Sequence, residues 1–315
     1  MLSIIIVTRD TVELLAALLA SIRNDVSLRP LLREIIVVDN ASRDETGQLV
    51  RERFPEVHYL QNVENRGFAA AANQGSAMAT GDFLLFLNSD TRLLPGEAEK
   101  VLSLMNSDAS VGIAGPRLVY EDMSPQRSFA KTPSLLHEVA PFSASAPFFT
   151  AKYSAGREGS SRAVDVESVI GAAMFVRAHI MRMLGGFDER FFFFLEETDF
   201  CVRAKQSGYR VIFSPSSRVI HLQGKTVRQR WVRGRIEYAI SLYKFIRKYH
   251  SDTYYRGFVL IRVVKSLLFL FATTILPFLL LNRSTRLRYA YYARLLLWHL
   301  QGLPDDAGLR SSSLK

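Results

Sequence analysis

The stretch that most constrains the fold is residues 82–91, in which five apolar residues run directly into a polar cluster. Phe83–Leu87 has the unbroken apolar character of a parallel strand buried on both faces. In open α/β sheets, ligands bind where such strands end. Asn88 and Asp90 point to the same side of an extended backbone. Oxygen ligands at this spacing suit one Mg or Mn ion, and an ordinary Asn/Ser/Asp turn explains the same residues without a metal.

Apolar runs and segments with helical spacing alternate through the first 90 residues. The apolar runs predict strands at Leu2–Val7, Glu34–Val38, Val57–Leu60 and Phe83–Leu87. The intervening segments predict helices at Thr11–Ile22, Thr46–Phe54 and Gly67–Thr80. This alternation is typical of an α/β fold with a doubly wound sheet, helices on both faces and polar side chains at the strand ends.

Asp39 directly follows the second predicted strand and has two interpretations. Its carboxylate can accept hydrogen bonds from a ribose or a base, or it can cap the next helix. Neither a G-x-G-x-x-G fingerprint nor a P-loop follows the first strand, so a bound nucleotide must be held in another way.

The second half predicts further strands and one long insertion. The strands are expected at Val111–Pro116 (a strand and turn), at Val166–Arg177 and, as the last strand, at Tyr209–Phe213, which Val219–His221 follows. Asp122–Ser161 is rich in Ser, Pro and Ala and is expected to be a mobile flap or acceptor loop.

Three acids, Glu196, Glu197 and Asp199, fall within four residues. Mutual repulsion and burial would raise the pKa of one of them toward the range of a general base. The macrodipole of a helix that starts here explains the same cluster without catalysis. A lone histidine after an apolar pair, His221, is by default structural.

Charge is distributed unevenly along the chain. Residues 1–220 carry 23 Lys and Arg against 26 Asp and Glu, and residues 221–315 carry 17 against 4, a balance of +13. The C-terminal third therefore calls for an anionic partner: lipid head groups, nucleic acid or a diphosphate. Lys225, Arg228 and Arg230 are either diphosphate ligands or solvated side chains. The single cysteine, Cys201, excludes an intramolecular disulfide, and we expect no cleaved signal peptide because the first apolar run stops at Arg9.

The C-terminal region differs in composition from the rest. Trp231–Tyr249 alternates basic and aromatic residues at helical spacing, and Phe258–Leu281 is mostly apolar. The longest uncharged part of that segment, residues 266–281, is shorter than the ~20 residues of a comfortable span. We therefore expect a domain at 1–230 and a helical region at 231–315 that lies on an anionic membrane surface. A true span and a soluble homodimer interface are the alternatives.

Four motifs, in order and spacing, resemble those of family 2 glycosyltransferases, and more narrowly the bacterial rhamnosyltransferase-like branch. They are Ile-Ile-Ile-Val-Thr8-Arg9-Asp10, Val-Val-Asp39-Asn40-Ala-Ser42-Arg43-Asp44, Asn65-Arg66-Gly67-Phe68-Ala-Ala-Ala-Ala-Asn73 and Phe-Leu-Asn88-Ser89-Asp90. The resemblance covers about residues 1–230. It implies a GT-A fold, a nucleotide-sugar donor and a divalent metal held by a D-x-D motif.

The resemblance also assigns roles by position. Asp90 and His221 would be metal ligands, with Asn88 standing where the first acid of the motif often stands. Glu197 would be the catalytic base, supported by Glu196 and Asp199. The donor would contact Thr8, Arg9, Asp39, Asn65, Arg66, Gly67, Asn73, Asn88, Ser89, Gly171 and Ala172, the small residues of the last pair admitting a sugar ring.

These expectations combine into an inverting, metal-dependent glycosyltransferase at the cytoplasmic face of a membrane. The donor suggested by the branch is dTDP-rhamnose, and the acceptor is a hydroxyl of a lipid-linked or growing cell-surface polysaccharide. A sugar-nucleotide pyrophosphorylase would need a Gly-rich basic loop after the first strand, which residues 8–11 lack. A nucleic-acid-binding protein would explain the basic tail and would leave the polar strand ends unexplained.

Overall fold

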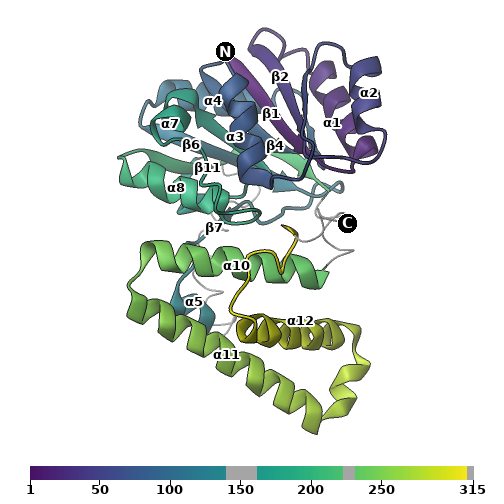
Figure 1. Cartoon of the computed structure of the whole chain (residues 1–315). Coiled ribbons are helices and arrows are strands. Elements are labelled where there is room, and N and C mark those ends of the chain that lie inside the picture. The colour runs from purple at the N-terminus through teal and green to yellow at the C-terminus, as the bar shows by residue number, and fades with distance from the viewer. Residues whose placement is uncertain (140–161, 223–230, 311–315) are drawn as a thin grey trace. The chain divides into compact units, whose positions relative to one another are not determined.

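The computed structural model describes residues 1–139, 162–222 and 231–310 (Figure 1). These residues divide into two compact units. The sheet unit holds residues 1–132, 162–189 and 196–222, and the helical unit holds residues 133–139, 190–195 and 231–310. The predicted diphosphate ligands at 225, 228 and 230 and part of the predicted flap, residues 140–161, lie outside the described residues.

The sheet unit is built, within the described residues, on a nine-stranded mixed sheet (Figure 1). The strand order is β3-β2-β1-β4-β10-β6-β11-β5, with β8 paired to β11. Strands β3, β2, β1 and β4 run parallel to one another, and β6 runs parallel to β11. Strand β10 lies between β4 and β6 and runs antiparallel to both. The strands are β1 (Leu2–Thr8), β2 (Leu32–Asp39), β3 (His58–Gln61), β4 (Phe83–Asn88), β5 (Thr91–Leu93), β6 (Val111–Val119), β8 (Val164–Asp165), β10 (Ala173–Arg177) and β11 (Arg210–His221). Strands β7 (Phe129–Ala130) and β9 (Ser168–Val169) form a separate pair.

Helices cover both faces of the sheet (Figure 1). They are α1 (Val12–Asn24), α2 (Thr46–Arg53), α3 (Phe68–Met78), α4 (Glu97–Ser107), α7 (Ala178–Met183) and α8 (Glu196–Gln206). Leucines of α1, Val50 of α2 and Val101 of α4 share one core with Ile4 and Ile6 of β1. On the opposite face, α3 packs so closely that a Cβ on Gly75 would lie 2.6 Å from Ile5 Cγ2. The fold class expected from the sequence is therefore confirmed.

Three local expectations need correction. Residues 166–177 do not form one strand, because a turn at Gly171 and Ala172 separates β9 from β10. The last strand, expected at 209–213, continues to His221 as β11, whose pairing with β6 shifts register between Ser214 and Arg218. Pro116 lies inside β6 rather than in a turn. In each case long-range pairing decides the conformation over the local pattern.

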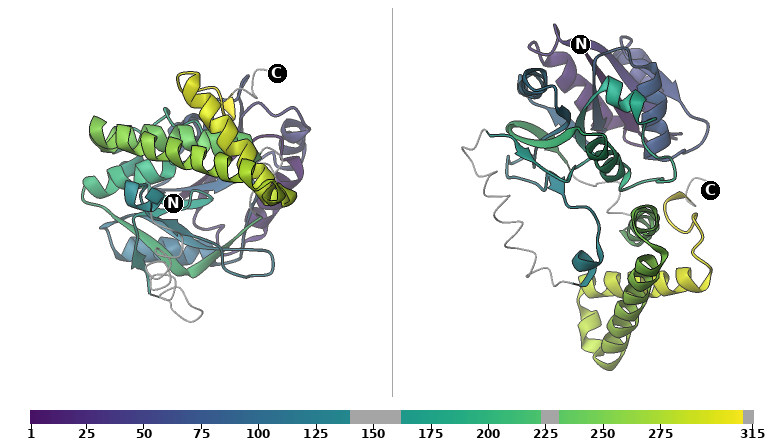
Figure 2. Two further views of the ribbon diagram at one scale, coloured as in Figure 1. Left: turned by 90° about the horizontal axis from the view of Figure 1, so that it is seen from below. Right: turned by 90° about the vertical axis from the view of Figure 1, so that its left-hand side faces the viewer.

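The helical unit consists of α5 (Leu135–Val139), α10 (Trp231–Tyr249), α11 (Asp252–Ile275), the 3₁₀ helix η1 (Pro277–Leu281) and α12 (Arg283–Leu300). The expected helix at Trp231–Tyr249 is confirmed with the same bounds. The apolar segment 258–281 is divided before Pro277, which cannot continue α11. Helices α11 and α12 pack against each other and are joined at one end by η1 (Figure 2).

Candidate active site

The polar clusters predicted from the sequence gather at one edge of the sheet. Thr8 ends β1, Asp39 ends β2 and Asn88 ends β4. In the strand register Thr8 is opposite Asp39, and Val7 is opposite Asn88. Parallel pairing therefore brings side chains from three motifs, distant in sequence, to the carboxyl edge where α/β proteins bind ligands.

Asp39 is fully buried at this edge. Its Oδ1 accepts a hydrogen bond from the backbone N–H of Ser42 at 2.8 Å, and the Tyr59 hydroxyl donates to its Oδ2. Burial, together with the bond to Asp39, raises the pKa of Tyr59, so this phenol stays protonated as a donor. Tyr59 was not predicted as a site residue, and it fixes the orientation of the Asp39 carboxylate.

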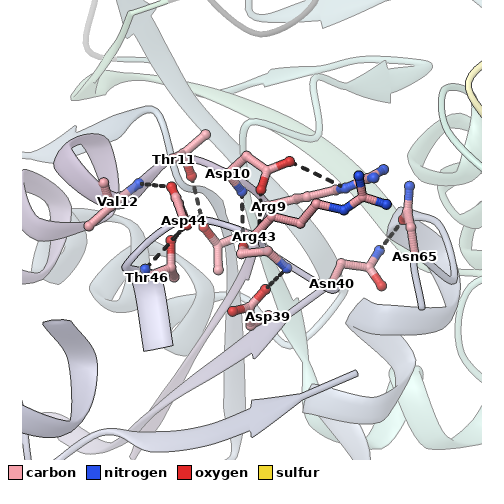
Figure 3. A network of polar contacts seen from close by, with 12 residues as sticks. Arg9, Asp10, Thr11, Val12, Asp39, Asn40, Arg43, Asp44, Thr46 and Asn65 are labelled. Carbon is pink, nitrogen blue, oxygen red and sulfur yellow. Dashed lines mark hydrogen bonds and ion pairs between the residues drawn. The ribbon is translucent and has the colours of Figure 1, made fainter. Parts of the chain in front are cut away.

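Hydrogen bonds connect the loop after β1 with the loop after β2 (Figure 3). Asp10 Oδ1 accepts from the backbone N–H of Arg43 at 2.7 Å, and Asp44 Oδ2 accepts from that of Val12 at 3.1 Å. Arg9 and Arg43 extend toward Asn65 in this view, with Arg9 Nε 3.7 Å from Asp10 Oδ2. Two cationic side chains therefore extend from these loops, and the sequence indicated only Arg9 of the two.

The loop at Asn65, Arg66 and Gly67 is organised by Asn40, a residue that sequence reasoning quoted without assigning a role. The Asn40 amide is 3% exposed and donates to Asn65 Oδ1 at 2.7 Å and to the Gly67 carbonyl at 3.0 Å. Its Oδ1 accepts from the Arg66 backbone N–H at 2.9 Å. Gly67 has a φ of +84°, a conformation that favours glycine. The structure thus brings the Asp39 and Asn65 motifs into one polar network.

Asn73 lies in α3 and makes a different set of contacts. Its amide nitrogen donates to the Phe187 carbonyl at 2.9 Å and to Glu189 Oε1 at 3.0 Å, and its Oδ1 accepts from the Phe187 N–H at 2.8 Å. A Cβ on Gly186 would lie 2.5 Å from Asn73 Oδ1, so only glycine fits there. These contacts brace the 186–189 turn against α3.

The Asn88 end of β4 meets the turn that separates β9 from β10. The Asn88 backbone N–H donates to the Ala172 carbonyl at 3.0 Å. A Cβ on Gly171 would lie 3.4 Å from Glu197 Cβ, so the turn also touches the start of α8. The predicted metal motif, small-residue turn and acid cluster are therefore contiguous. Ser89 is tied to this edge through Thr11, whose Oγ1 donates to Ser89 Oγ at 2.9 Å and contacts Thr8 Oγ1 at 2.8 Å.

Burial separates the three acids at the start of α8. Glu196 is 5% exposed and Asp199 is fully buried, whereas Glu197 is partly exposed. Asp199 Oδ2 accepts from Arg203 Nε at 2.7 Å, and Arg203 also donates to the Leu184 and Gly186 carbonyls. Asp199 thus holds a structural arginine, and Glu197 is the least buried of the three acids, although its Oε2 is buried.

Asp90 and His221 come together through the pairing of β5 with β11. Thr91 is opposite His221 in this antiparallel ladder, and the Leu222 N–H donates to the Asp90 carbonyl at 2.9 Å. Asp90 Oδ1 lies 3.5 Å from His221 Nε2. Neighbouring ligands of an octahedral ion bound at about 2.0–2.1 Å lie about 2.9 Å apart, so the two atoms would have to approach each other by roughly 0.6 Å to bind one such ion. Within the described residues no group of three or more His, Cys, Asp or Glu is placed to hold a metal, so two protein ligands would be completed by phosphate and water.

A pocket of about 600 Å³ opens next to the loops after β1 and β2, and its walls include none of the predicted site residues. It is lined by Val12, Arg43, Asp44, Glu45, Gly47, Gln48, Arg51 and Gln61. The predicted site itself is an open edge of the sheet rather than this pocket.

A mixed, mostly parallel sheet with helices on both faces is the architecture of GT-A glycosyltransferases. The chain belongs to glycosyltransferase family 2: the family described as "Glycosyl transferase family 2" matches residues 3–169. Family membership favours the glycosyltransferase over the pyrophosphorylase considered from the sequence.

Named relatives agree with the expected branch. The chain is 28% identical over 233 residues to an N-acetylglucosaminyl-diphospho-decaprenol L-rhamnosyltransferase of Mycobacterium tuberculosis, an alignment that covers 69% of this chain and 75% of the relative. It is 27% identical to the pre-mycofactocin glycosyltransferase of the same organism, with 76% of this chain and 46% of the relative covered.

Solved structures share the fold. A mannosyltransferase from Pyrobaculum calidifontis, in complex with GDP-Man and Mn²⁺, superimposes with a TM-score of 0.61 at 18% identity, covering 96% of this chain and 87% of that one. Residues 1–349 of S. aureus TarS in complex with UDP-GlcNAc give a TM-score of 0.53 at 15% identity, covering 82% of this chain and 70% of that one.

Proposed function

We propose that this protein is an inverting glycosyltransferase that moves a sugar from a nucleotide-sugar donor to a hydroxyl of a lipid-linked glycan. The observation that carries the proposal is the chain of contacts from Asn88 through Ala172 and Gly171 to Glu197, which supports Glu197 as a base next to the predicted metal motif. The mycobacterial relative is named for rhamnosyl transfer to a diphospho-decaprenol-linked sugar, which supports this acceptor class and makes dTDP-rhamnose the first donor to test.

Glu197 is the proposed general base. Its carboxylate takes the proton of the acceptor hydroxyl as that oxygen attacks the anomeric carbon from the face opposite the leaving group. Glu196 and Asp199, both buried, support the start of α8 rather than touching the acceptor. Gly171 and Ala172 leave room for the sugar ring next to Glu197, because a side chain at 171 would project onto it.

Asp90 and His221 are the proposed protein ligands of a Mg or Mn ion. The donor set fits such an ion, because a carboxylate oxygen and an imidazole nitrogen converge at 3.5 Å. When bound, the cation would neutralise charge on the departing diphosphate. Arg9 and Arg66 supply further positive charge at the same edge, and a hydrogen bond from the ribose or base to Asp39 requires the loops that bury it here to open.

The helical unit is proposed to lie on the cytoplasmic face of a membrane. Of the helices that the structure describes, α11 alone is long and apolar enough to cross a bilayer, judged by length and composition. Apolar side chains on α11 and η1 are widely exposed within the chain, among them Leu268 at 61%, Phe271 at 66% and Phe278 at 61%. Arg283, Arg286 and Arg288 follow directly on α12 and suit anionic head groups. Peripheral attachment keeps the site close to a lipid-linked acceptor.

The proposal is tested by release of nucleotide from a panel of nucleotide-sugars, with Mg²⁺ or Mn²⁺ and with EDTA. We expect turnover of one donor that EDTA abolishes and that Asp90→Ala lowers at least a hundredfold. Asp82→Ala is the matched control. Asp82 lies directly before the first residue of β4, at the end of the strand away from Asp90, and its side chain is 78% exposed. Equal activity in both variants would contradict the assignment of Asp90, and no turnover or binding of any donor would contradict the proposed function.

A further inference from the structure

We propose that Gln126 is a positioning residue that holds His221 in the Nδ1–H tautomer, so that the Nε2 lone pair faces Asp90. The inference rests on the proposed cation site and deepens it. Gln126 does not belong to any motif that the sequence indicated, and it lies in the segment after β6, next to an isolated bridge between Val119 and Pro125.

Gln126 is buried and anchored at its backbone. It is 6% exposed, and its N–H donates to the Leu118 carbonyl at 2.8 Å. A polar side chain in such a position is retained only when its hydrogen-bonding groups are satisfied. The Gln126 side-chain amide has three hydrogen-bond partners, and two of them are atoms of His221.

The orientation of the Gln126 amide follows from the partners themselves. Its nitrogen donates to the His221 carbonyl at 2.5 Å and to the Val119 carbonyl at 3.3 Å. Both partners are backbone carbonyls, which only accept, so the amide nitrogen and not the oxygen must face them. The reversed orientation would place three oxygens against one another in a buried site. Oε1 is therefore left pointing at the His221 ring.

This orientation decides which ring nitrogen of His221 carries hydrogen. Gln126 Oε1 lies 3.0 Å from His221 Nδ1 and, as an acceptor, requires that Nδ1 donate. In a neutral imidazole the other nitrogen, Nε2, then has a lone pair, and Nε2 is the atom 3.5 Å from Asp90 Oδ1. Two acceptors that converge in this way form a donor set for a cation. Outer partners of this kind fix the ring and typically change metal affinity by about 10–100-fold.

Backbone pairing and Gln126 fix different parts of His221, the proposed metal ligand. The β5–β11 ladder sets the position of the His221 backbone, with Thr91 opposite it. Rotation of the ring about its side-chain bonds is left open by that ladder, and the contact with Gln126 fixes it. Gln126 also binds the His221 carbonyl, so one side chain contacts both the backbone and the ring of His221.

The first experiment is ¹⁵N NMR of the histidine rings in the full chain without metal, with the His221 signals assigned by their loss in His221→Gln. We expect the Nδ1–H tautomer in the wild type and loss of that preference in Gln126→Met, which has a similar length and no acceptor. In Gln126→Glu one oxygen still faces Nδ1, so the tautomer is expected to survive, whereas the second oxygen meets the Val119 and His221 carbonyls and the variant is expected to be less stable than the wild type. An Nε2–H tautomer in the wild type would overturn the inference.

The second experiment measures Mn²⁺ affinity by calorimetry, with and without dTDP. We expect Gln126→Met to lower affinity about 10–100-fold and Gln126→Glu to lower it less. Gln74→Met is the matched control, because the Gln74 amide exchanges two hydrogen bonds with Asn62 at 2.9 and 3.0 Å and touches neither proposed ligand. If Gln126→Glu and Gln126→Met lose affinity in proportion to their loss of thermal stability, the role is structural and the inference is wrong. Failure of the wild type to bind Mn²⁺ overturns the proposed cation site itself, whereas the tautomer spectrum tests Gln126 separately.

Discussion

Exposure distinguishes the acids at the start of α8, where charge and spacing alone do not. Glu196 and Asp199 are buried and Glu197 is partly exposed, although all three share the first turn of one helix. The sequence predicted both a catalytic cluster and a helix start at this position. The two interpretations are compatible, because the macrodipole stabilises all three carboxylates and one of them, Glu197, is less buried than the other two.

Replacing Glu197 with Gln is expected to lower the rate of sugar transfer by about 10²–10⁴-fold, the range for loss of a general base. Donor affinity should change little, because the substitution keeps the size of the side chain. Single-turnover kinetics and donor calorimetry measure the two quantities. Glu99→Gln, an exposed acid in the first turn of α4, is the control. A Glu197→Gln enzyme with unchanged turnover would move the role of base to another residue.

Glu237 is a buried acid of the helical unit with an altered pKa. It is 1% exposed on α10, and its Oε2 accepts from the Leu309 backbone N–H at 2.8 Å, which holds the C-terminal segment. Burial raises the pKa of Glu237 to about 7 from an ordinary 4.5. The folded chain therefore binds this proton more tightly than the unfolded chain does.

Stability should accordingly fall as pH rises from 4.5 to 7 and stay low above 7, with Glu237 contributing about 1–3 kcal/mol to the change. Glu237→Gln, which cannot ionise, should flatten this dependence. Urea denaturation at several pH values, with hydrogen exchange at Leu309 as a local probe, measures the effect. A wild-type pH profile that the substitution leaves unaltered would contradict this assignment.

At the scale of elements, α5 is attached to α11 by a buried arginine. Arg262 is 8% exposed; its Nη1 donates to Glu138 Oε2 at 3.2 Å and its Nη2 to the Tyr291 hydroxyl at 2.6 Å. Lys265 Nζ reaches Glu138 Oε1 at 3.0 Å. One carboxylate thus compensates two cations of α11, so α5 and α11 depend on each other.

Glu138→Gln is expected to destabilise the helical unit by about 2–3 kcal/mol, because a buried guanidinium loses its counter-charge. The value is at the low end for such pairs because the Glu138 side chain is still 20% exposed. Denaturant unfolding monitored by exchange of α11 amides measures it. Asp305→Asn, which removes an exposed ion pair with Lys244, should cost less than about 1 kcal/mol. Equal effects of the two substitutions would show that the buried pair has no special weight.

Elements with a strong local signal were predictable, and those set by long-range contact were not. The sequence of Phe83–Leu87 predicts a buried strand, because the residues on both of its faces are apolar. The turn at Gly171 depends on its contact with Glu197 of α8, which no local pattern contains. The predicted strand ended at Phe213, and the structure continues it as β11 through an irregularity between Ser214 and Arg218.

The candidate site was predictable where a motif carried it. The strand ends at Thr8, Asp39 and Asn88 were predictable, because each is a polar residue that follows an apolar run. Gln126 and Tyr59 gave no such signal, because a single Gln or Tyr acquires its function only from the partner that folding places beside it. Residues that orient others are therefore the part of a site that sequence reasoning misses first.

At the scale of the whole molecule, charge is divided between the parts of the chain. Residues 1–220 are close to neutral, and residues 221–315 carry a balance of +13. Apolar exposure follows the same division, since the side chains of α11 and η1 include many of the widely exposed ones. Positive charge beside apolar surface favours an anionic bilayer, whereas nucleic acid requires the charge alone.

The full chain is expected to bind vesicles that contain phosphatidylglycerol, more weakly at higher salt, and to ignore vesicles of phosphatidylcholine alone and duplex DNA. Replacing both Phe271 and Phe278 with Ser should lower vesicle binding at least tenfold, since each is more than half exposed. Val63→Ser, a fully exposed apolar residue of the sheet unit, is the control. Co-sedimentation measures the binding. Tighter binding to DNA than to vesicles would contradict the membrane assignment.

The pairing of β5 with β11 also has a bearing on synthesis. Asp90 is translated early, and strands β1 to β4 can associate while the rest of the chain is still being made. His221 ends the last strand of the sheet and reaches Asp90 only when β11 joins both β6 and β5. Long-range pairing of this kind forms late in folding. A nascent chain on the ribosome would thus have the donor-facing loops before it has the Asp–His pair, and would gain that pair only when its sheet is complete.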